Sequence, residues 1–239
     1  KPIPVDSDAG TFQMSPVSVR KQITSKTVAI LATHMFGSPC DIKSLKKIAE
    51  NNKLLLIEDC AESLGATLKG QQTGTFGDIS FSSFNIAKPL QGIGGGVIFG
   101  RNKEIISRVR LGLKRSKTTL NLPIREITKS LCGYYLSQTK LWSVFMYLFS
   151  FPKIQHLFVL LYRHNENINM GVRGVSCYFA FIINENLKTF RKRLAKTQTI
   201  SAYYRKRLSP FIDFQKQLTD ITGNGYMVTA FYKGDVLKL

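Results

Sequence analysis

Three residue types that could do chemistry together lie between Lys53 and Gly100. Asp59 directly follows an apolar run, Ser83 closes a second one, and Lys88 stands alone before a cluster of glycines. A neutral lysine amine can form a Schiff base with a carbonyl compound, and a serine hydroxyl can donate to a phosphate. A carboxylate can keep a pyridine nitrogen protonated. This set of groups is what chemistry on pyridoxal 5'-phosphate (PLP) requires.

Asp59 also has a purely structural interpretation, because an acid after a strand often caps the helix that follows. The glycines after Lys88 favour the chemical interpretation, since they allow positive φ and a close approach of the backbone to a ligand. A lone lysine between an apolar strand and these glycines is poorly explained as a solvated surface charge. The glycines are Gly92, Gly94, Gly95 and Gly96.

The elements around these residues alternate between strands and helices. The run 54–57 (LLLI) shows no alternation, which predicts a strand covered on both faces of a parallel sheet. Functional groups of such sheets gather beyond the carboxyl ends of the strands, where Asp59 stands. The pattern predicts strands at 27–32, 54–57, 78–84 and 97–99, and helices at 15–23, 41–52 and 102–114.

Three blocks of sequence point to a family. They are EDCAESLGA at 58–66, GTFGD at 74–78 and SFNIAK at 83–88, followed by the glycines. Their order and spacing resemble those of the DegT/DnrJ/EryC1/StrS aminotransferases, which are PLP-dependent sugar aminotransferases of fold type I. The resemblance implies an α/β fold with a mixed, mostly parallel sheet flanked by helices.

The resemblance also implies roles for individual residues. Lys88 would be the Schiff-base lysine, Asp59 the partner of the pyridinium nitrogen, and Ser83 a phosphate contact. Glu62 takes a position that is often Gln in the family and would contact the ring oxygen of the cofactor. Related sugar 3-dehydratases have a histidine in place of the lysine, so Lys88 favours transamination. No metal is expected.

The reaction implied by the resemblance moves an amino group from an amino acid, expected to be glutamate, to a nucleotide-linked keto sugar. It would serve cell-surface polysaccharide or secondary-metabolite biosynthesis, in a homodimer with sites at the interface. His34 lies in a loop that resembles the family's H-x-[YF]-G-x-P-x-D segment. It could stand near the cofactor or could be a structural histidine at a strand end, and general burial habits favour the latter.

Three segments are predicted. Residues 1–115 would form the central PLP-binding domain, residues 116–170 a hydrophobic and basic helical insertion, and residues 171–239 a long basic helix and the start of a small C-terminal domain. Family members extend further at both ends, so the chain looks like a central part of an aminotransferase. Ser176 aligns with the serine of the family's R-M-S motif, but Gly174 replaces its arginine.

The insertion contains two apolar runs, 141–151 and 157–162, both shorter than the roughly 20 residues that span a bilayer. Three interpretations of residues 128–163 stay open. They could form a helical hairpin packed on the protein or on a second subunit, an interfacial hairpin on an anionic membrane, or a spanning helix.

Charge is distributed unevenly along the chain, whose net charge is +19. Residues 1–100 carry 10 Lys and Arg against 8 Asp and Glu, whereas the remainder carries 24 against 7. The basic half predicts an anionic partner such as acidic lipid, a nucleotide-linked substrate or nucleic acid, although no nucleic-acid motif is present. The amphipathic basic helix expected at 187–208 has a simpler interpretation as a solvated surface helix.

Composition narrows the class of protein further. A hydrophobic content of 44% with 21% charged residues is typical of a folded globular chain. The four scattered cysteines argue against a disulfide framework or zinc site, and with the absence of a signal peptide they predict a cytoplasmic protein. Association of this protein with a membrane surface stays open as an alternative. Two alternatives to an enzyme stay open: a non-catalytic or truncated PLP-fold module, and an anionic-membrane or nucleic-acid surface binder.

Overall fold

A computed structural model of the chain describes residues 1–114 except 86 and 93, residues 177–231, and scattered positions between 128 and 175. Its contacts form two compact units: Lys1–Leu111 together with Phe179–Leu239, and Gly112–Tyr178. Most of the predicted insertion at 128–163 lies outside the described residues, and so do Gly174 and Ser176. The division into three segments therefore stays a prediction.

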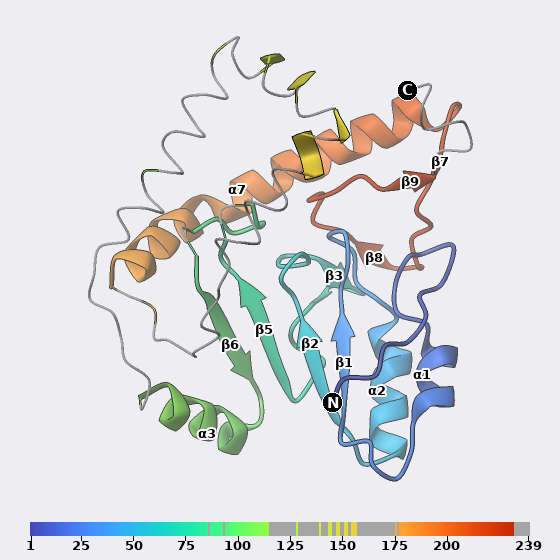
Figure 1. The fold of residues 1–239 in the computed structure, drawn as a ribbon, viewed down its shortest axis with the longest axis vertical. Coiled ribbons are helices and arrows are strands. Elements are labelled where there is room, and N and C mark those ends of the chain that lie inside the picture. The colour runs from blue at the N-terminus through green and yellow to red at the C-terminus, as the bar shows by residue number, and fades with distance from the viewer. Residues whose placement is uncertain are drawn as a thin grey trace. The chain divides into compact units, whose positions relative to one another are not determined.

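A four-stranded sheet forms the centre of the first unit (Figure 1). Its order is β1-β2-β5-β6, and β1, β2 and β5 run parallel whereas β6 is antiparallel to β5. The predicted α/β class with a mixed, mostly parallel sheet is therefore confirmed. The strands are β1 (Ala29–Thr33), β2 (Leu55–Asp59), β5 (Ile79–Ser83) and β6 (Gly96–Gly100), all close to their predicted positions.

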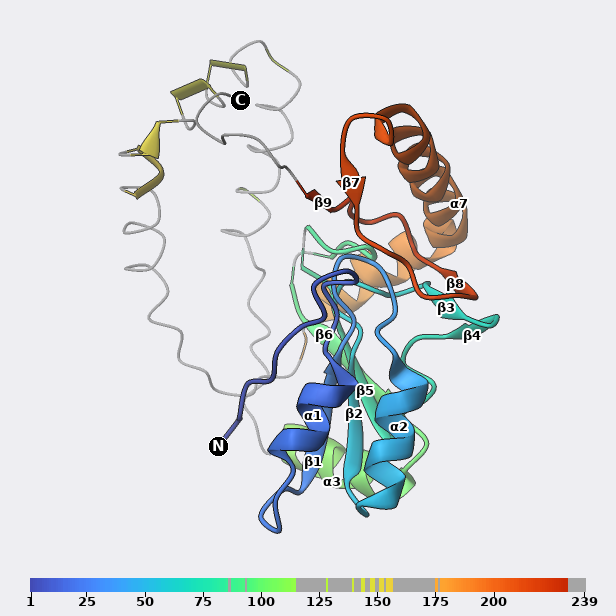
Figure 2. The same ribbon diagram turned by 90° about the vertical axis from the view of Figure 1, so that its right-hand side faces the viewer.

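One face of the sheet is covered by two helices that begin at the predicted caps. Helix α1 (Pro16–Gln22) follows Ser15, and helix α2 (Ile42–Asn51) follows Asp41, whose carboxylate accepts the Ser44 N–H at 3.2 Å. Helix α2 lies along β1 and β2 (Figure 2). The resulting core joins Val19 of α1, the apolar face of α2 (Ile42, Leu45, Ile48 and Ala49) and the strand residues Ile30, Ala32 and Leu56.

The opposite face of the sheet keeps large apolar side chains in contact with solvent. Leu31 is 48% exposed, Leu55 40% and Ile98 45%. Burial alternates along β2 because Leu56 and Glu58 point to the helix side while Leu55, Ile57 and Asp59 point to the other. Within the described part of the chain, the prediction that strand 54–57 is covered on both faces is therefore wrong.

Small antiparallel pairs connect the sheet to the C-terminal region. Strand β3 (Thr67–Leu68) pairs with β4 (Gln71–Gln72) on one side and with β8 (Ile221–Thr222) on the other. Strand β7 (Asp213–Phe214) pairs with β9 (Ala230–Phe231). Helix α3 (Lys103–Lys114) follows β6 and is capped by Asn102, which accepts the Ile105 N–H at 3.1 Å.

The long helix α7 (Cys177–Leu208) begins ten residues before the predicted start and passes the end of the sheet to which β1, β2 and β5 point (Figure 1). The expected apolar stripe is only partly correct. Phe190 and Leu194 do face the body, where both approach Gly65, but Leu187, Ile200 and Tyr204 are exposed. The side of the helix that is most buried contains Ser201, and on this side Thr197 and Gln198 donate to the carbonyls of Asn224 and Gly223 in the loop below.

Membrane crossing was one open interpretation of the apolar runs. Among the helices that the structure describes, none combines the length and the apolar composition that crossing a bilayer needs. Residues 157–162 are not among those described.

Two neighbouring leucines of β2 test the difference between the faces of the sheet. We expect Leu56→Ala, which empties a site that is 2% exposed, to lower the free energy of unfolding by about 2–5 kcal/mol. Leu55→Ala on the open face should cost about 1 kcal/mol or less, because little apolar area leaves a packed environment. Urea unfolding of both variants measures the two values. Equal losses would show that the second face is packed as tightly as the first.

Candidate active site

Asp59 and Ser83 lie side by side at the carboxyl ends of neighbouring parallel strands. Asp59 is the last residue of β2 and is in register with Phe81 of β5, and Ser83 ends β5 two residues later. Because side chains alternate along a strand, Asp59, Phe81 and Ser83 point to the same face, the one that is partly open. The sheet thus brings together two of the four predicted site residues.

The Asp59 carboxylate is half-buried and makes a local contact. Its Oδ1 accepts the Ala61 N–H at 2.9 Å, and the described residues offer Oδ2 no hydrogen bond. A run of turns, not a helix, follows at 61–65. The structural interpretation of Asp59 as a helix cap is therefore wrong, and one carboxylate oxygen stays available to a ligand.

Lys88 and Glu62 form the second pair. The Lys88 Nζ lies 3.2 Å from Glu62 Oε1, and the two side chains are only 24% and 19% exposed. The other oxygen of Glu62 accepts the Phe36 N–H at 3.0 Å. Phe36 follows the end of β1 and Glu62 follows the end of β2, so the ion pair places Lys88 at the same end of the sheet as Asp59 and Ser83. No described hydrogen bond joins the two pairs directly.

The last two serines of β5 differ in availability. Ser82 is buried and donates to the Cys60 carbonyl at 3.2 Å. Ser83 is half-buried, and its Oγ accepts the Asn85 N–H at 3.4 Å, which leaves the hydroxyl proton for another acceptor. Of the two, Ser83 keeps a hydroxyl proton for a ligand, and its phosphate contact stays a prediction.

The glycines after Lys88 are explained by backbone geometry. Gly94 and Gly95 adopt φ values of 140° and 82°, which L residues rarely adopt. A Cβ on Gly96 would lie 2.6 Å from the Ser82 carbonyl oxygen, so the strand that carries it can approach β5 only without a side chain.

Glu58 is the main residue that the sequence did not single out. Its carboxylate is fully buried, yet it accepts N–H groups from Gly74, Phe76 and Gly77 at 2.8, 2.7 and 2.6 Å. Burial alone raises the pKa of Glu58, but hydrogen bonds from His34, Gly77 and Gly74 outweigh it, so its pKa lies below the usual value. Glu58 therefore fixes the GTFGD loop to the strand that ends in Asp59.

His34 is structural, in agreement with the favoured interpretation of the sequence. It is fully buried, its Nδ1 accepts the Cys40 N–H at 3.1 Å, and its Nε2 lies 3.0 Å from Glu58 Oε2. Since Nδ1 accepts, Nε2 carries the proton and donates it to the carboxylate. The imidazole is thus neutral, and its hydrogen bond to Glu58 connects the end of β1 with the end of β2.

His34, Glu58 and Cys60 offer ligand atoms within 4.8 Å of one another, which are residue types that bind metals. Hydrogen bonds account for this cluster without an ion, because both nitrogens of His34 are engaged. Burial, together with the nearby Glu58 carboxylate, raises the pKa of Cys60 to about 12.

Asn224 is a second residue that sequence reasoning missed. It is 1% exposed, and its amide donates to the carbonyls of Glu62 and Leu64 at 2.7 and 3.1 Å. Its N–H donates to the Gly37 carbonyl, and Tyr226 donates from its hydroxyl to the Ala87 carbonyl at 2.6 Å. The C-terminal region thus holds the loops on both sides of the Lys88–Glu62 pair. The only signal in the sequence was the small polar turn Gly223–Gly225.

Taken together, the four predicted residues surround one end of the sheet. A carboxylate with a free oxygen, a hydroxyl and an amine at the ends of adjacent elements fit a cofactor that presents a ring nitrogen, a phosphate and a carbonyl carbon. The arrangement can also move protons, because Glu62 lies within hydrogen-bond reach of Lys88.

Comparison with known proteins gives a family match. A model of the DegT/DnrJ/EryC1/StrS aminotransferase family matches residues 1–134. GDP-perosamine synthase of Escherichia coli O157:H7 is 43% identical over 107 residues, which is 45% of this chain and 29% of that enzyme. The chain therefore spans less than a third of the length of this relative.

Solved structures share the fold. The crystal structure of S. venezuelae DesV superimposes with a TM-score of 0.68 at 20% identity, over 96% of this chain and 51% of that one. E. coli GDP-4-keto-6-deoxy-D-mannose-3-dehydratase with bound hydrated PLP gives a TM-score of 0.64 at 20% identity, over 97% and 54%. The fold is thus found in a dehydratase as well.

The buried Glu58 carboxylate predicts a pH-dependent stability. Because its folded-state pKa lies below the unfolded-state value of about 4.3, it stabilises the fold above that pH, and this stabilisation is lost as the pH falls through the folded-state pKa. Glu58→Gln should cost about 3 kcal/mol at pH 7 and remove this component of the acid dependence. Unfolding curves from pH 7 to pH 3 measure both effects. Glu50→Gln, at an exposed position, is the control, and an equal loss there would contradict the assignment.

Asn224→Ala should lower the free energy of unfolding by about 1–3 kcal/mol, because it removes a buried side chain that donates to the carbonyls of Glu62 and Leu64. The exposed Asn52 makes one local side-chain hydrogen bond, so Asn52→Ala should cost less than about 1 kcal/mol. Denaturant unfolding compares the two variants. Indistinguishable curves would show that Asn224 does not hold these loops.

Proposed function

The chain belongs to the DegT/DnrJ/EryC1/StrS aminotransferase family, and from this we propose that it carries the lysine side of a PLP-dependent sugar aminotransferase site. One observation carries the proposal. The family's lysine, Lys88, is paired with Glu62 at the end of the sheet where Asp59 and Ser83 also lie. This is an enzyme assignment, and it rests on residues 58–96, which lie within the family match.

PLP, when bound, supplies an electron sink that stabilises negative charge on the α-carbon of an amino substrate. Asp59 would hold the pyridine nitrogen protonated through the oxygen that its contact with Ala61 leaves free. The Ser83 hydroxyl would donate to the phosphate, and Glu62 would approach the ring oxygen. These roles are proposals that come from the family resemblance, and the positions of the side chains at one end of the sheet support them.

Lys88 would hold the cofactor covalently through Nζ and, once released, move the proton between substrate and cofactor. Only the neutral amine attacks a carbonyl, so the ammonium must first lose a proton. Glu62 Oε1, 3.2 Å from Nζ, is placed to receive it. The backbone N–H of Phe36 keeps the carboxylate in this orientation.

Transamination, not dehydration, is the reaction we propose. The fold does not distinguish the two, because a sugar 3-dehydratase shares it. The distinction depends on the residue at position 88, which is a lysine here, whereas related 3-dehydratases have a histidine. A lysine can return the proton that transamination requires.

We infer the substrates from the relatives. A GDP-perosamine synthase is among the most similar curated proteins, so we propose a nucleotide-linked keto sugar as acceptor and an amino acid, glutamate by family expectation, as donor. Such a reaction belongs to cell-surface polysaccharide or secondary-metabolite biosynthesis. A homodimer, and contact of residues 128–163 with a membrane surface, remain part of this proposal.

Borohydride trapping tests the central claim. The chain is incubated with PLP, reduced and digested, and the modified peptide is identified by mass spectrometry. We expect the adduct on Lys88, because its position at the strand ends concentrates the cofactor there. Lys88→Ala should remove this adduct.

Lys69→Ala is the matched control, since Lys69 is an exposed lysine paired with Asp220. It should leave the yield on Lys88 unchanged. Modification spread evenly over surface lysines, with the same total in Lys88→Ala, would reject the assignment. It would favour the alternative of a non-catalytic PLP-fold module.

A further inference from the structure

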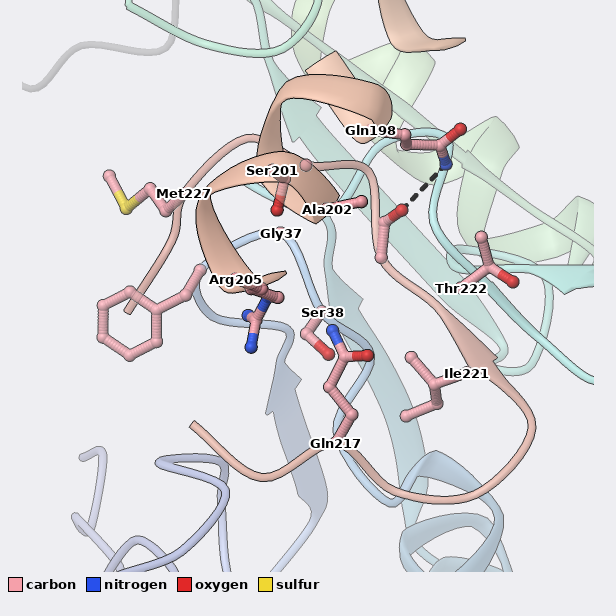
Figure 3. A pocket seen from close by; sticks show the side chains of 13 residues that line it. Gly37, Ser38, Gln198, Ser201, Ala202, Arg205, Gln217, Ile221, Thr222 and Met227 are labelled. Atoms are coloured by element: carbon pink, nitrogen blue, oxygen red, sulfur yellow. Dashed lines mark hydrogen bonds between the residues drawn. The ribbon is translucent and has the colours of Figure 1, made fainter. Parts of the chain in front are cut away.

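A cavity of about 280 Å³ lies between helix α7 and the C-terminal strands (Figure 3). Phe36, Ile221 and Met227 form apolar parts of its wall. Arg205 of α7 turns its guanidinium toward the middle of the space, where Ser38 and Gln217 also present their polar ends (Figure 3). The volume is at the lower limit for ligand sites, so it suits a compact molecule.

Arg205 is a half-buried cation whose guanidinium makes few contacts that could replace its lost hydration. Its Nη1 makes one long hydrogen bond, 3.4 Å, to the Gln215 carbonyl, and its guanidinium stacks 5.3 Å from the Phe214 ring centroid. No acid in the described ranges pairs with it. Burial lowers the pKa of Arg205, as expected for a charge that has lost water without gaining an anion.

One acidic residue, Asp220, is adjacent in sequence to the cavity wall, but its carboxylate is paired elsewhere. Asp220 precedes Ile221, but its carboxylate pairs with Lys69 at 3.3 Å on the outside of the protein, where both side chains are more than half exposed. Buried or half-buried charges are ordinarily paired. Among the described residues, therefore, no carboxylate balances the positive charge of Arg205 in the cavity.

Other polar groups around the cavity are also available. The side chains of Ser38, Ser201 and Gln217 make no hydrogen bond to any described residue, and Ser38 and Ser201 are buried. The amide of Gln198 differs, because it already donates to the Gly223 carbonyl at 2.8 Å (Figure 3). Two hydroxyls and one amide thus surround the guanidinium as free donors.

We propose that this cavity is a second binding site, for the carboxylate or phosphate group of a compact metabolite. The guanidinium fork of Arg205 matches the two oxygens of such a group, and the hydroxyls and the Gln217 amide can donate to the remaining lone pairs. The apolar wall would take the carbon skeleton. The basic second half of the chain, which predicts an anionic partner, contains Arg205.

The site is separate from that of Lys88. None of Asp59, Glu62, Ser83 and Lys88 lines the cavity. The two sites meet at two segments. The Phe36 N–H donates to Glu62 while Phe36 and Gly37 form part of the cavity wall, and Asn224 donates to the Glu62 carbonyl while Gly223 and Gly225 line the cavity. The proposal therefore does not depend on the aminotransferase assignment.

Calorimetric titration with inorganic phosphate and, separately, with succinate tests the proposal at constant ionic strength. We expect saturable binding of one equivalent of at least one probe, and which probe binds distinguishes phosphate from carboxylate recognition. Arg205→Ala should weaken it at least about tenfold, because charge-assisted hydrogen bonds are lost. Gln217→Ala, at an exposed position, should weaken it about threefold.

Arg207→Ala is the matched control, because it removes the same charge from the same helix at an exposed position outside the cavity. It should change the affinity less than about twofold. Equal weakening by Arg207→Ala would show general attraction to a chain of charge +19, and no saturable binding of either probe would also overturn the proposal. If Ser83→Ala abolishes binding while Arg205→Ala does not, phosphate occupies the cofactor site instead.

Ala202→Leu is a second variant that tests the same site if Arg205→Ala does not fold. Ala202 lines the cavity on the exposed side of α7, so a larger side chain fills the space without removing a charge or a buried contact. Binding should be lost in this variant while its thermal unfolding stays unchanged. Retained affinity would show that the anion binds elsewhere.

Discussion

The buried carboxylate of Glu58 is the constraint on which this end of the sheet depends. A carboxylate that is fully buried stays charged at low free-energy cost only if its oxygens accept hydrogen bonds. In Glu58 they accept three from backbone N–H groups and one from the His34 imidazole. Three of these donors belong to the GTFGD loop and the fourth follows β1, so the carboxylate fixes the loop after β1 and the GTFGD loop together. Asp59 is the next residue, and its position follows from this arrangement.

Contacts between distant segments complete the site. Glu62 connects the loop after β1 with Lys88, and Asn224 holds Glu62 and Gly37 from the C-terminal side. Gly37 and Gly225 make this close approach possible, since both have positive φ and a Cβ on either would overlap its neighbours. The C-terminal region, about which the sequence revealed little, therefore supports the predicted lysine.

Local patterns predicted the fold well where a single rule decides the structure. The caps Ser15 and Asp41 accept the N–H groups of Ser18 and Ser44, three residues further on. The strands lie close to their predicted positions, although β2 ends at Asp59 and β5 at Ser83 and the predicted ends were 57 and 84. The predictions failed where residues distant in sequence decide the structure. The stripe of α7 was placed by apolar spacing, but the loops under that helix are polar, and Ser201 is buried instead. Glu58 and Asn224 could not be found because their partners lie 16 to 162 residues away.

The second half of the chain shows why total charge is a weak guide to binding. Most of the lysines and arginines that the structure describes there are exposed, and a solvated charge attracts any anion weakly and without a fixed geometry. Arg205 differs because it is partly withdrawn from water, has no acid beside it in the described residues, and faces free hydroxyl and amide groups. Specific recognition of an anion requires this combination of desolvation and fixed donors, and a count of charges does not reveal it.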